Sequence, residues 1–222
     1  MRRKNERLPV CKSEKFILSG ETPFAVREAY EAARTELLRA LAADGRKIVA
    51  VTSCSPSEGK STNCLNLAVI TAETGAKVLL VDCDMRKPVI HTLLHLDNKA
   101  GLSSFLGGIE NDVSRAIDRN VRPNLDVMTS GPIPPNPAEL ISGAGTDDLL
   151  RYAAGHYDYV FIDTPPVSAV TDAFLMNTRI AGIIIVVREG STRHEDIREC
   201  IAGAKMSNTR VLGFIKANCA VK

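Results

Sequence analysis

The segment Ser53–Thr62 has the residue types and spacing of a loop that binds the phosphate groups of a nucleotide. It follows the apolar run Lys47–Ser53 and opens a predicted helix, which is the context that a P-loop requires. In such a loop, backbone N–H groups and the positive end of the helix surround the phosphates. Cys54 replaces the usual first glycine. The residues expected to contact phosphate are Ser57, Glu58, Gly59, Lys60, Ser61 and Thr62.

Within this loop, two side chains have the chemistry to act on a nucleotide directly. The Lys60 ammonium is expected to reach the β- and γ-phosphates, and the Ser61 hydroxyl is expected to bind magnesium. The alternative is a chance GKST sequence at the start of a helix. Two further motifs, in the order that a P-loop protein needs, argue against that alternative.

Two later apolar runs end in acidic side chains. The first is Val78–Asp82, with Asp84 two residues further on, and the second is Tyr159–Asp163. Acids at the carboxyl ends of strands lie where ligands bind in open α/β sheets. Asp82 and Asp84 can therefore hold hydrated magnesium or take a proton from a nucleophile, although solvated acids at a strand-end turn are the alternative. Asp163 has the Walker B arrangement, in which the acid binds the magnesium shell.

The elements that carry these motifs are predicted from apolar patterns and from helix start and stop signals. Thr22 and Pro23 indicate the N-cap and first residue of a helix that runs to about Ala42. Further helices are expected at Lys60–Thr74 with Gly75 as its C-cap, at Pro137–Tyr152 with a break around Gly143–Gly145, and at Arg193–Met206. The expected strands are Lys47–Ser53, Val78–Asp82, Leu125–Thr129, Tyr159–Asp163, Gly182–Val187 and Arg210–Ala217. Because these strands are apolar throughout and alternate with helices, they predict an α/β fold with a doubly wound, mostly parallel sheet.

The length of 222 residues predicts one nucleotide-binding domain, residues 21–222, preceded by a basic and mobile arm, residues 1–20. Residues 1–15 hold six basic and two acidic side chains. A solvated tail is one interpretation of this charge run, and contact with an anionic membrane or an acidic partner is the other. The net charge of +2 does not indicate a nucleic-acid-binding protein.

Cysteine usage and hydropathy point to a reduced cytosolic protein. The six cysteines form neither a CxxC pair nor a zinc spacing. The N-terminus has no apolar core of a signal peptide, and the longest apolar run, Ile180–Val187, is too short to span a membrane. Cys54 and Cys83 flank the expected phosphate site, where they are either small buried hydrophobes or a redox switch.

Taken together, the three motifs resemble those of the bacterial tyrosine kinases, P-loop proteins of capsule and exopolysaccharide synthesis, in their stand-alone cytosolic form. Three further stretches share the resemblance: Gly101–Leu106 (GLSSFL), Gly131–Leu140 (GPIPPNPAEL) and Asp163–Asp172 (DTPPVSAVTD). The resemblance implies phosphoryl transfer from ATP, with Mg²⁺, to tyrosine. It also implies a membrane adaptor of the polysaccharide chain-length regulator type, which would hold the cytoplasmic chain at the inner face of the membrane.

The same resemblance implies roles for individual residues. Asp82 would be the base or magnesium partner of the attacking tyrosine hydroxyl, and Arg86 would lie near the transferred phosphate. The implied catalytic residues are Asp82, Asp84, Lys60 and Arg86, and the implied metal ligands are Ser61, Asp82 and Asp163. Protein tyrosines would be the substrates.

The closest rival family is the Min/Par group of partitioning ATPases, whose loop carries an extra lysine that reaches across a dimer. This chain has Ser55 at that position. Without the lysine, the charge for that contact between subunits is absent, which argues against the Min/Par group.

Three departures from the tyrosine kinase pattern leave alternatives open. The family's C-terminal tyrosine cluster is absent, since the tyrosines are Tyr30, Tyr152, Tyr157 and Tyr159. The helix-one motif ExxRxxR reads Glu28, Glu31 and Arg34, which leaves homo-oligomer formation open. Lys216-Ala217 replaces a Leu-Asn pair on the adenine side. An ATP-binding scaffold, or a Min/Par-like ATPase without tyrosine transfer, is therefore the second interpretation.

Overall fold

Apolar strands that alternate with helices require a sheet covered on both faces, and the computed structural model has this arrangement. It describes residues 17–168 and 180–218. The seven strands lie in the order β3-β4-β2-β5-β1-β6-β7. Their bounds are β1 Ile48–Ser53, β2 Val78–Asp82, β3 Asp118–Arg122, β4 Leu125–Met128, β5 Tyr159–Asp163, β6 Gly182–Arg188 and β7 Val211–Ala217. The predicted α/β sheet is therefore confirmed.

All neighbouring strands run parallel except β3, which pairs antiparallel with β4. Strand β3 was not among the strands predicted from the sequence. Its five residues, DRNVR, are polar and none is fully buried. A strand at the edge of the sheet needs no continuous apolar run, so its sequence carries little signal.

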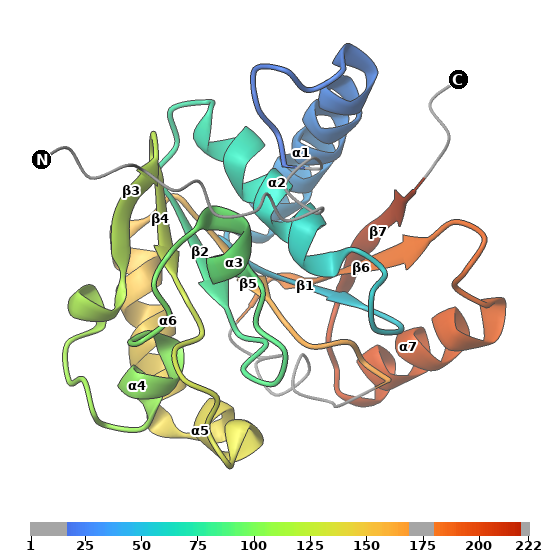
Figure 1. The fold of residues 1–222 in the computed structure, drawn as a ribbon. Coiled ribbons are helices and arrows are strands. Elements are labelled where there is room, and N and C mark those ends of the chain that lie inside the picture. The colour runs from blue at the N-terminus through green and yellow to red at the C-terminus, as the bar shows by residue number, and fades with distance from the viewer. Residues whose placement is uncertain (1–16, 169–179, 219–222) are drawn as a thin grey trace, which may run out of the picture.

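Helices cover the two faces of the sheet in separate layers (Figure 1). Helices α1 (Phe24–Asp44), α2 (Lys60–Ala72) and α3 (Ile90–Leu94) contribute to one apolar cluster. The opposite cluster receives α4 (Leu102–Leu106), the 3-10 helix η2 (Val113–Ala116), α5 (Pro137–Ser142), α6 (Ala144–His156) and α7 (His194–Met206). Alternate residues of each central strand enter opposite clusters, which is why the strands are apolar throughout.

Helix boundaries differ from the prediction by one or two residues at several ends. Pro23 is the N-cap of α1 rather than its first residue, and the Thr22 hydroxyl accepts a hydrogen bond from the Ser19 backbone N–H. Helix α2 ends at Ala72, and Gly75 takes its left-handed conformation in the following turn. The predicted break at Gly143 is confirmed, because it separates α5 from α6.

The end of the expected N-terminal arm belongs to the packed core. Ile17 and Leu18 are buried in the same cluster as α1 and α2. The Leu18 N–H donates to Asn66 Oδ1 at 2.9 Å, and its carbonyl accepts from Arg122 at 2.7 Å. Residues 1–16, which carry the basic run, lie outside the described residues, as do residues 169–172 of the DTPPVSAVTD stretch.

Two of the stretches that carried the family resemblance pack against each other. The Leu102 N–H donates to the Thr129 carbonyl, and the Ser103 hydroxyl donates to the Pro132 carbonyl at 2.6 Å. Backbones approach so closely here that a Cβ on Gly101 would lie 2.3 Å from the Thr129 oxygen. Glycine is therefore required at position 101 for space rather than for an unusual φ.

Candidate active site

Topology brings the three motifs together at one edge of the sheet. Strand β5 lies between β1 and β2, and Asp163 pairs in register with Val51 on one side and with Asp82 on the other. The loop after β1 therefore begins beside Asp163. Because parallel strands end at the same edge, the P-loop and the acids of β2 and β5 converge there.

Lys60 is the centre of the cluster, and its ammonium contacts two carboxylates. The Nζ atom lies 2.8 Å from Asp84 Oδ2 and 3.3 Å from Asp163 Oδ1. It also donates to the Ser61 hydroxyl at 3.0 Å. The Lys60 side chain is only 11% exposed and that of Asp163 is fully buried. Burial lowers the pKa of Lys60, but the charges of Asp163 and Asp84 outweigh burial and raise that pKa above its ordinary value.

Asp82 is held by backbone donors rather than by the lysine. Its carboxylate accepts from the N–H groups of Asp84 and Ile90, each at 3.2 Å. Burial and the neighbouring charge of Asp163 raise the pKa of Asp82 to about 8, despite the opposing charge of Lys60. Burial also raises the pKa of Asp163, although Lys60 and a hydrogen bond with Ser61 oppose the rise. Crowded acids of this kind attract a cation.

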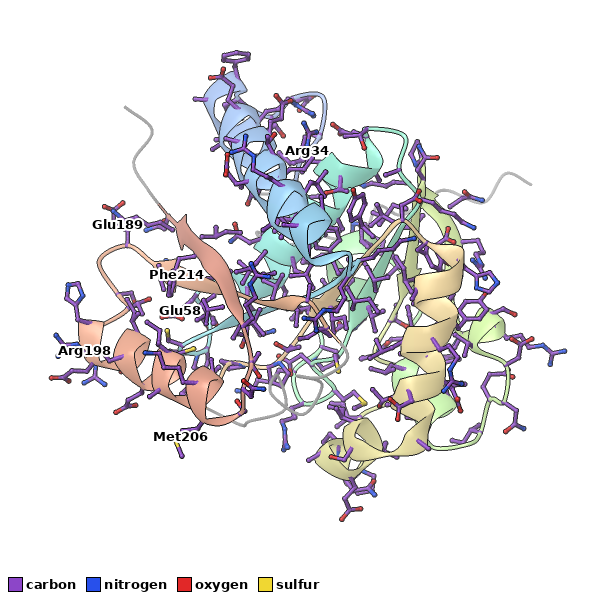
Figure 2. The ribbon with its side chains drawn as sticks, turned by 180° about the vertical axis from the view of Figure 1, so that it is seen from behind. Arg34, Glu58, Glu189, Arg198, Met206 and Phe214 are labelled. Carbon is purple, nitrogen blue, oxygen red and sulfur yellow. The ribbon has the colours of Figure 1, made fainter. Side chains whose placement is uncertain are left out.

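Two residues of the P-loop form hydrogen bonds with the segment at the end of β6, and these contacts were not predicted from the sequence. Glu58 is buried, and its carboxylate accepts from the Ser55 N–H at 2.9 Å and from the Thr192 hydroxyl. Arg188 also donates to the Ser57 carbonyl at 3.2 Å. Figure 2 shows Glu58 on the side of the molecule where β6 leads into α7. The Glu58 side chain therefore shapes the loop through these protein contacts.

The remaining expected site residues lie at or beside this cluster, but they are less enclosed. Gly59 has a left-handed φ of 92° and caps α2, and Thr62 is half-buried in the first turn. Ser57 and Arg86 are exposed. The structure thus unites Lys60, Ser61, Asp82, Asp84 and Asp163 in one buried group, and it leaves Arg86 outside that group.

The oxygen ligands available here fit magnesium better than a metal that needs a full protein cage. In residues 17–168 and 180–218, no group of three or more His, Cys, Asp or Glu side chains is placed to hold a metal ion. Magnesium is usually bound by one or two carboxylates together with phosphate oxygens and water. Ser61, Asp82 and Asp163 supply a hydroxyl and two carboxylates, which suits that pattern.

The cysteines near the loop pack as small apolar groups. Cys54 and Cys83 are buried, and Cys54 shares a hydrogen bond with Cys200 of α7. This bond and burial raise the pKa of Cys54, so its thiol stays neutral. None of Cys54, Cys64, Cys83 and Cys200 forms a disulfide.

Arg34 of the altered helix-one motif makes a contact within the chain. Its guanidinium donates to the Ile70 carbonyl of α2 at 3.0 Å. In Figure 2 the labelled Arg34 projects from α1 on the side of α2. This arginine therefore helps to seat α1 on α2.

Comparisons with known proteins agree with this fold. A family model described as an AAA domain matches residues 46–193. Tyrosine-protein kinase YwqD of Bacillus subtilis is 40% identical over 188 residues, which are 85% of this chain and 79% of YwqD. Tyrosine-protein kinase wzc of Salmonella typhimurium is 33% identical over 91% of this chain, which spans only 28% of the length of wzc.

Solved structures give the same result. The kinase domain of the Escherichia coli tyrosine kinase ETK superposes with a TM-score of 0.82 at 29% identity, and the match covers 89% of this chain and 78% of that domain. The septum site-determining protein MinD of Pyrococcus horikoshii, at 22% identity, has a TM-score of 0.63, covering 77% of this chain and 69% of MinD. The likeness to MinD extends to the fold alone.

The doubly wound sheet and the loop at the end of β1 define a P-loop nucleotide-binding protein. Within that class, the chain belongs to the bacterial tyrosine-protein kinase family.

Proposed function

We propose that the protein is an ATP-dependent protein-tyrosine kinase that works in capsular or extracellular polysaccharide synthesis. The observation that carries the proposal is the buried group of Lys60, Ser61, Asp82, Asp84 and Asp163 beside the P-loop. It combines a cation for phosphate, hard oxygens for Mg²⁺ and a carboxylate able to accept a proton.

Each side chain has a role in this scheme. Backbone N–H groups of the loop and Lys60 bind the ATP phosphates, and Ser61 and Asp163 hold the magnesium shell. Mg²⁺, when bound, neutralises charge on the phosphates. Asp82 orients the tyrosine hydroxyl and accepts its proton, with Asp84 beside it. Arg86, which is exposed, lies near the transferred phosphate in this scheme.

The proposed setting is the inner face of the cell membrane, where an adaptor of the polysaccharide chain-length regulator type recruits the kinase. No helix in the described part of the chain is long and apolar enough to cross a membrane. The proposed adaptor provides the membrane attachment, and the basic run in residues 1–15 favours an anionic surface.

Incubation of the full chain with ATP, Mg²⁺ and the cytosolic segment of the adaptor tests the kinase activity. Phosphotyrosine on the chain, the adaptor or an added protein is expected, and it should be absent from Lys60→Met. An absence of phosphotyrosine from every protein, despite ATP binding, would contradict tyrosine transfer.

A second candidate, an ATP-dependent scaffold without tyrosine transfer, is favoured by the placement of the tyrosines. All four precede residue 160. Tyr157 is buried, and the Tyr30 hydroxyl donates to Asn63. ATP-dependent capture of the adaptor without any phosphotyrosine would support the scaffold over the kinase.

A further inference from the structure

A hydrogen-bonded path joins the outer helix α1 to the P-loop. The Tyr30 hydroxyl, on α1, donates to Asn63 Oδ1 at 2.9 Å. The amide of Asn63, on α2, then donates through Nδ2 to the Gly59 carbonyl at 2.9 Å. Gly59 directly precedes Lys60, so the path ends on the loop itself.

The Gly59 carbonyl controls the direction of a neighbouring donor. It accepts two hydrogen bonds from Asn63, one from the side chain and one from the backbone N–H, both at 2.9 Å. The peptide group between Gly59 and Lys60 is planar and trans, so the Lys60 N–H points opposite to that carbonyl. Holding the carbonyl along α2 therefore directs the Lys60 N–H out of the helix N-terminus, where a phosphate binds.

Tyr30 anchors the Oδ1 side of the Asn63 amide. The Gly59 carbonyl can only accept a hydrogen bond, so Nδ2 faces it and Oδ1 accepts from the Tyr30 hydroxyl. Burial raises the pKa of Tyr30, against an opposing hydrogen bond from Asn66, so the hydroxyl stays protonated and available as a donor. Asn66 in turn accepts from the Leu18 N–H. Leu18, α1 and α2 thus meet at this one point.

We propose that Tyr30 and Asn63 are positioning residues that set the affinity of the P-loop for ATP, and that they make this affinity depend on how α1 is seated on α2. The inference rests on the proposed binding of ATP at this loop. Any partner or second copy that moves α1 would change ATP affinity, and bound ATP would by linkage hold α1 in place.

Titration calorimetry of the full chain with ATP and Mg²⁺ tests the proposal. Tyr30→Phe removes only the hydroxyl, and Asn63→Ala removes both side-chain bonds. Each variant is expected to weaken ATP binding about fivefold, because each interrupts the same path to the Gly59 carbonyl and losing one hydrogen bond has an effect of about this size. In the kinase assay, the KM for ATP should rise while kcat stays near that of the wild type.

Arg27→Gln is the matched control. Arg27 also joins α1 to α2, through Glu73 at 2.6 Å, but this contact does not reach the loop. The Arg27→Gln substitution should weaken the packing of α1 on α2. It should leave ATP affinity within about twofold of the wild type, which is less than the effect of one hydrogen bond. Thermal unfolding of all variants separates stability from affinity.

The outcomes are distinct. Wild-type affinity in Tyr30→Phe would overturn the proposal, even if Asn63→Ala proved too unstable to study. Equal weakening by Arg27→Gln and Tyr30→Phe would overturn it as well, since general loosening of α1 would then explain both. A wild-type chain that does not bind ATP would refute the proposed function first, and this inference with it.

Discussion

Replacing Lys60 by methionine should destabilise the protein in the absence of nucleotide, in addition to abolishing phosphate binding. The ammonium contacts Asp84 and Asp163 in a site where all three side chains are almost fully buried. Asp82 adds a further acid next to Asp163. Methionine has a similar length but no charge, so the substitution leaves these acids without their cation.

The size of the effect follows from the burial. Removing one partner of a buried ion pair costs about 3–5 kcal/mol of folding free energy. Proton uptake limits the loss here, because burial already raises the pKa of Asp82 to about 8 and raises the pKa of Asp163. We therefore expect a loss of about 3 kcal/mol at neutral pH, near the low end of that range. For a chain of this length, the melting temperature should fall by roughly 6–12 °C.

Urea and thermal unfolding without nucleotide measure this loss. Lys99→Met is the control, since Lys99 is 89% exposed and pairs with Asp97 on the surface. It should change the unfolding free energy by less than about 0.5 kcal/mol. Adding Asp163→Asn to Lys60→Met should recover part of the stability by removing one unpaired acid. A Lys60→Met chain as stable as the wild type would refute the reasoning.

Two further predictions concern the fold away from the loop. The Asp126 carboxylate accepts hydrogen bonds from Arg119 at 2.8 Å, from the Tyr157 hydroxyl at 2.7 Å and from the Asn120 N–H at 2.8 Å. Asp126→Asn should therefore lower the free energy of unfolding, measured in urea at pH 7, by about 2–3 kcal/mol. Burial opposes ionisation, but these bonds outweigh it and lower the pKa of Asp126. Its stabilising effect is therefore present above about pH 4 and lost as pH falls further; a gap between variant and wild type that persists at pH 2 would contradict this. Gly101→Ala places a Cβ 2.3 Å from a backbone oxygen, so it should cost more than about 3 kcal/mol or prevent folding, and near-wild-type unfolding would disprove the close approach.

The sequence alone predicted the class of fold and named the residues that the structure brings together beside the P-loop. Continuous apolar runs such as Val78–Asp82 and Tyr159–Asp163 have a single stable environment, the inside of a covered parallel sheet, so both strands lie where they were predicted. The glycine, lysine and serine of the P-loop occur at a fixed spacing because the helix N-terminus requires them there. An acid at the carboxyl end of a buried strand must lie at the edge of the sheet.

Contacts between distant segments could not be predicted from the sequence. The Glu58–Thr192 bond joins residues 134 positions apart, and only the packing of β6 beside β1 brings them together. Short helices such as α3 and α4 have five residues each, too few for a helical period to appear. The strand order that places Asp163 between the P-loop and Asp82 is likewise a property of the tertiary structure.

The P-loop illustrates the division between the two. Local chemistry in SPSEGKST predicts that phosphate binds there, because each donor lies within a few residues of the next. The tertiary structure decided what holds that loop in shape: Thr192 and Arg188 on one side, and Asn63 and Tyr30 on the other. Thr192, Arg188 and Tyr30 come from elements separate from the loop, and their hydrogen bonds form only once the sheet and its helices have packed, whereas the Asn63–Gly59 bond is local to the start of α2.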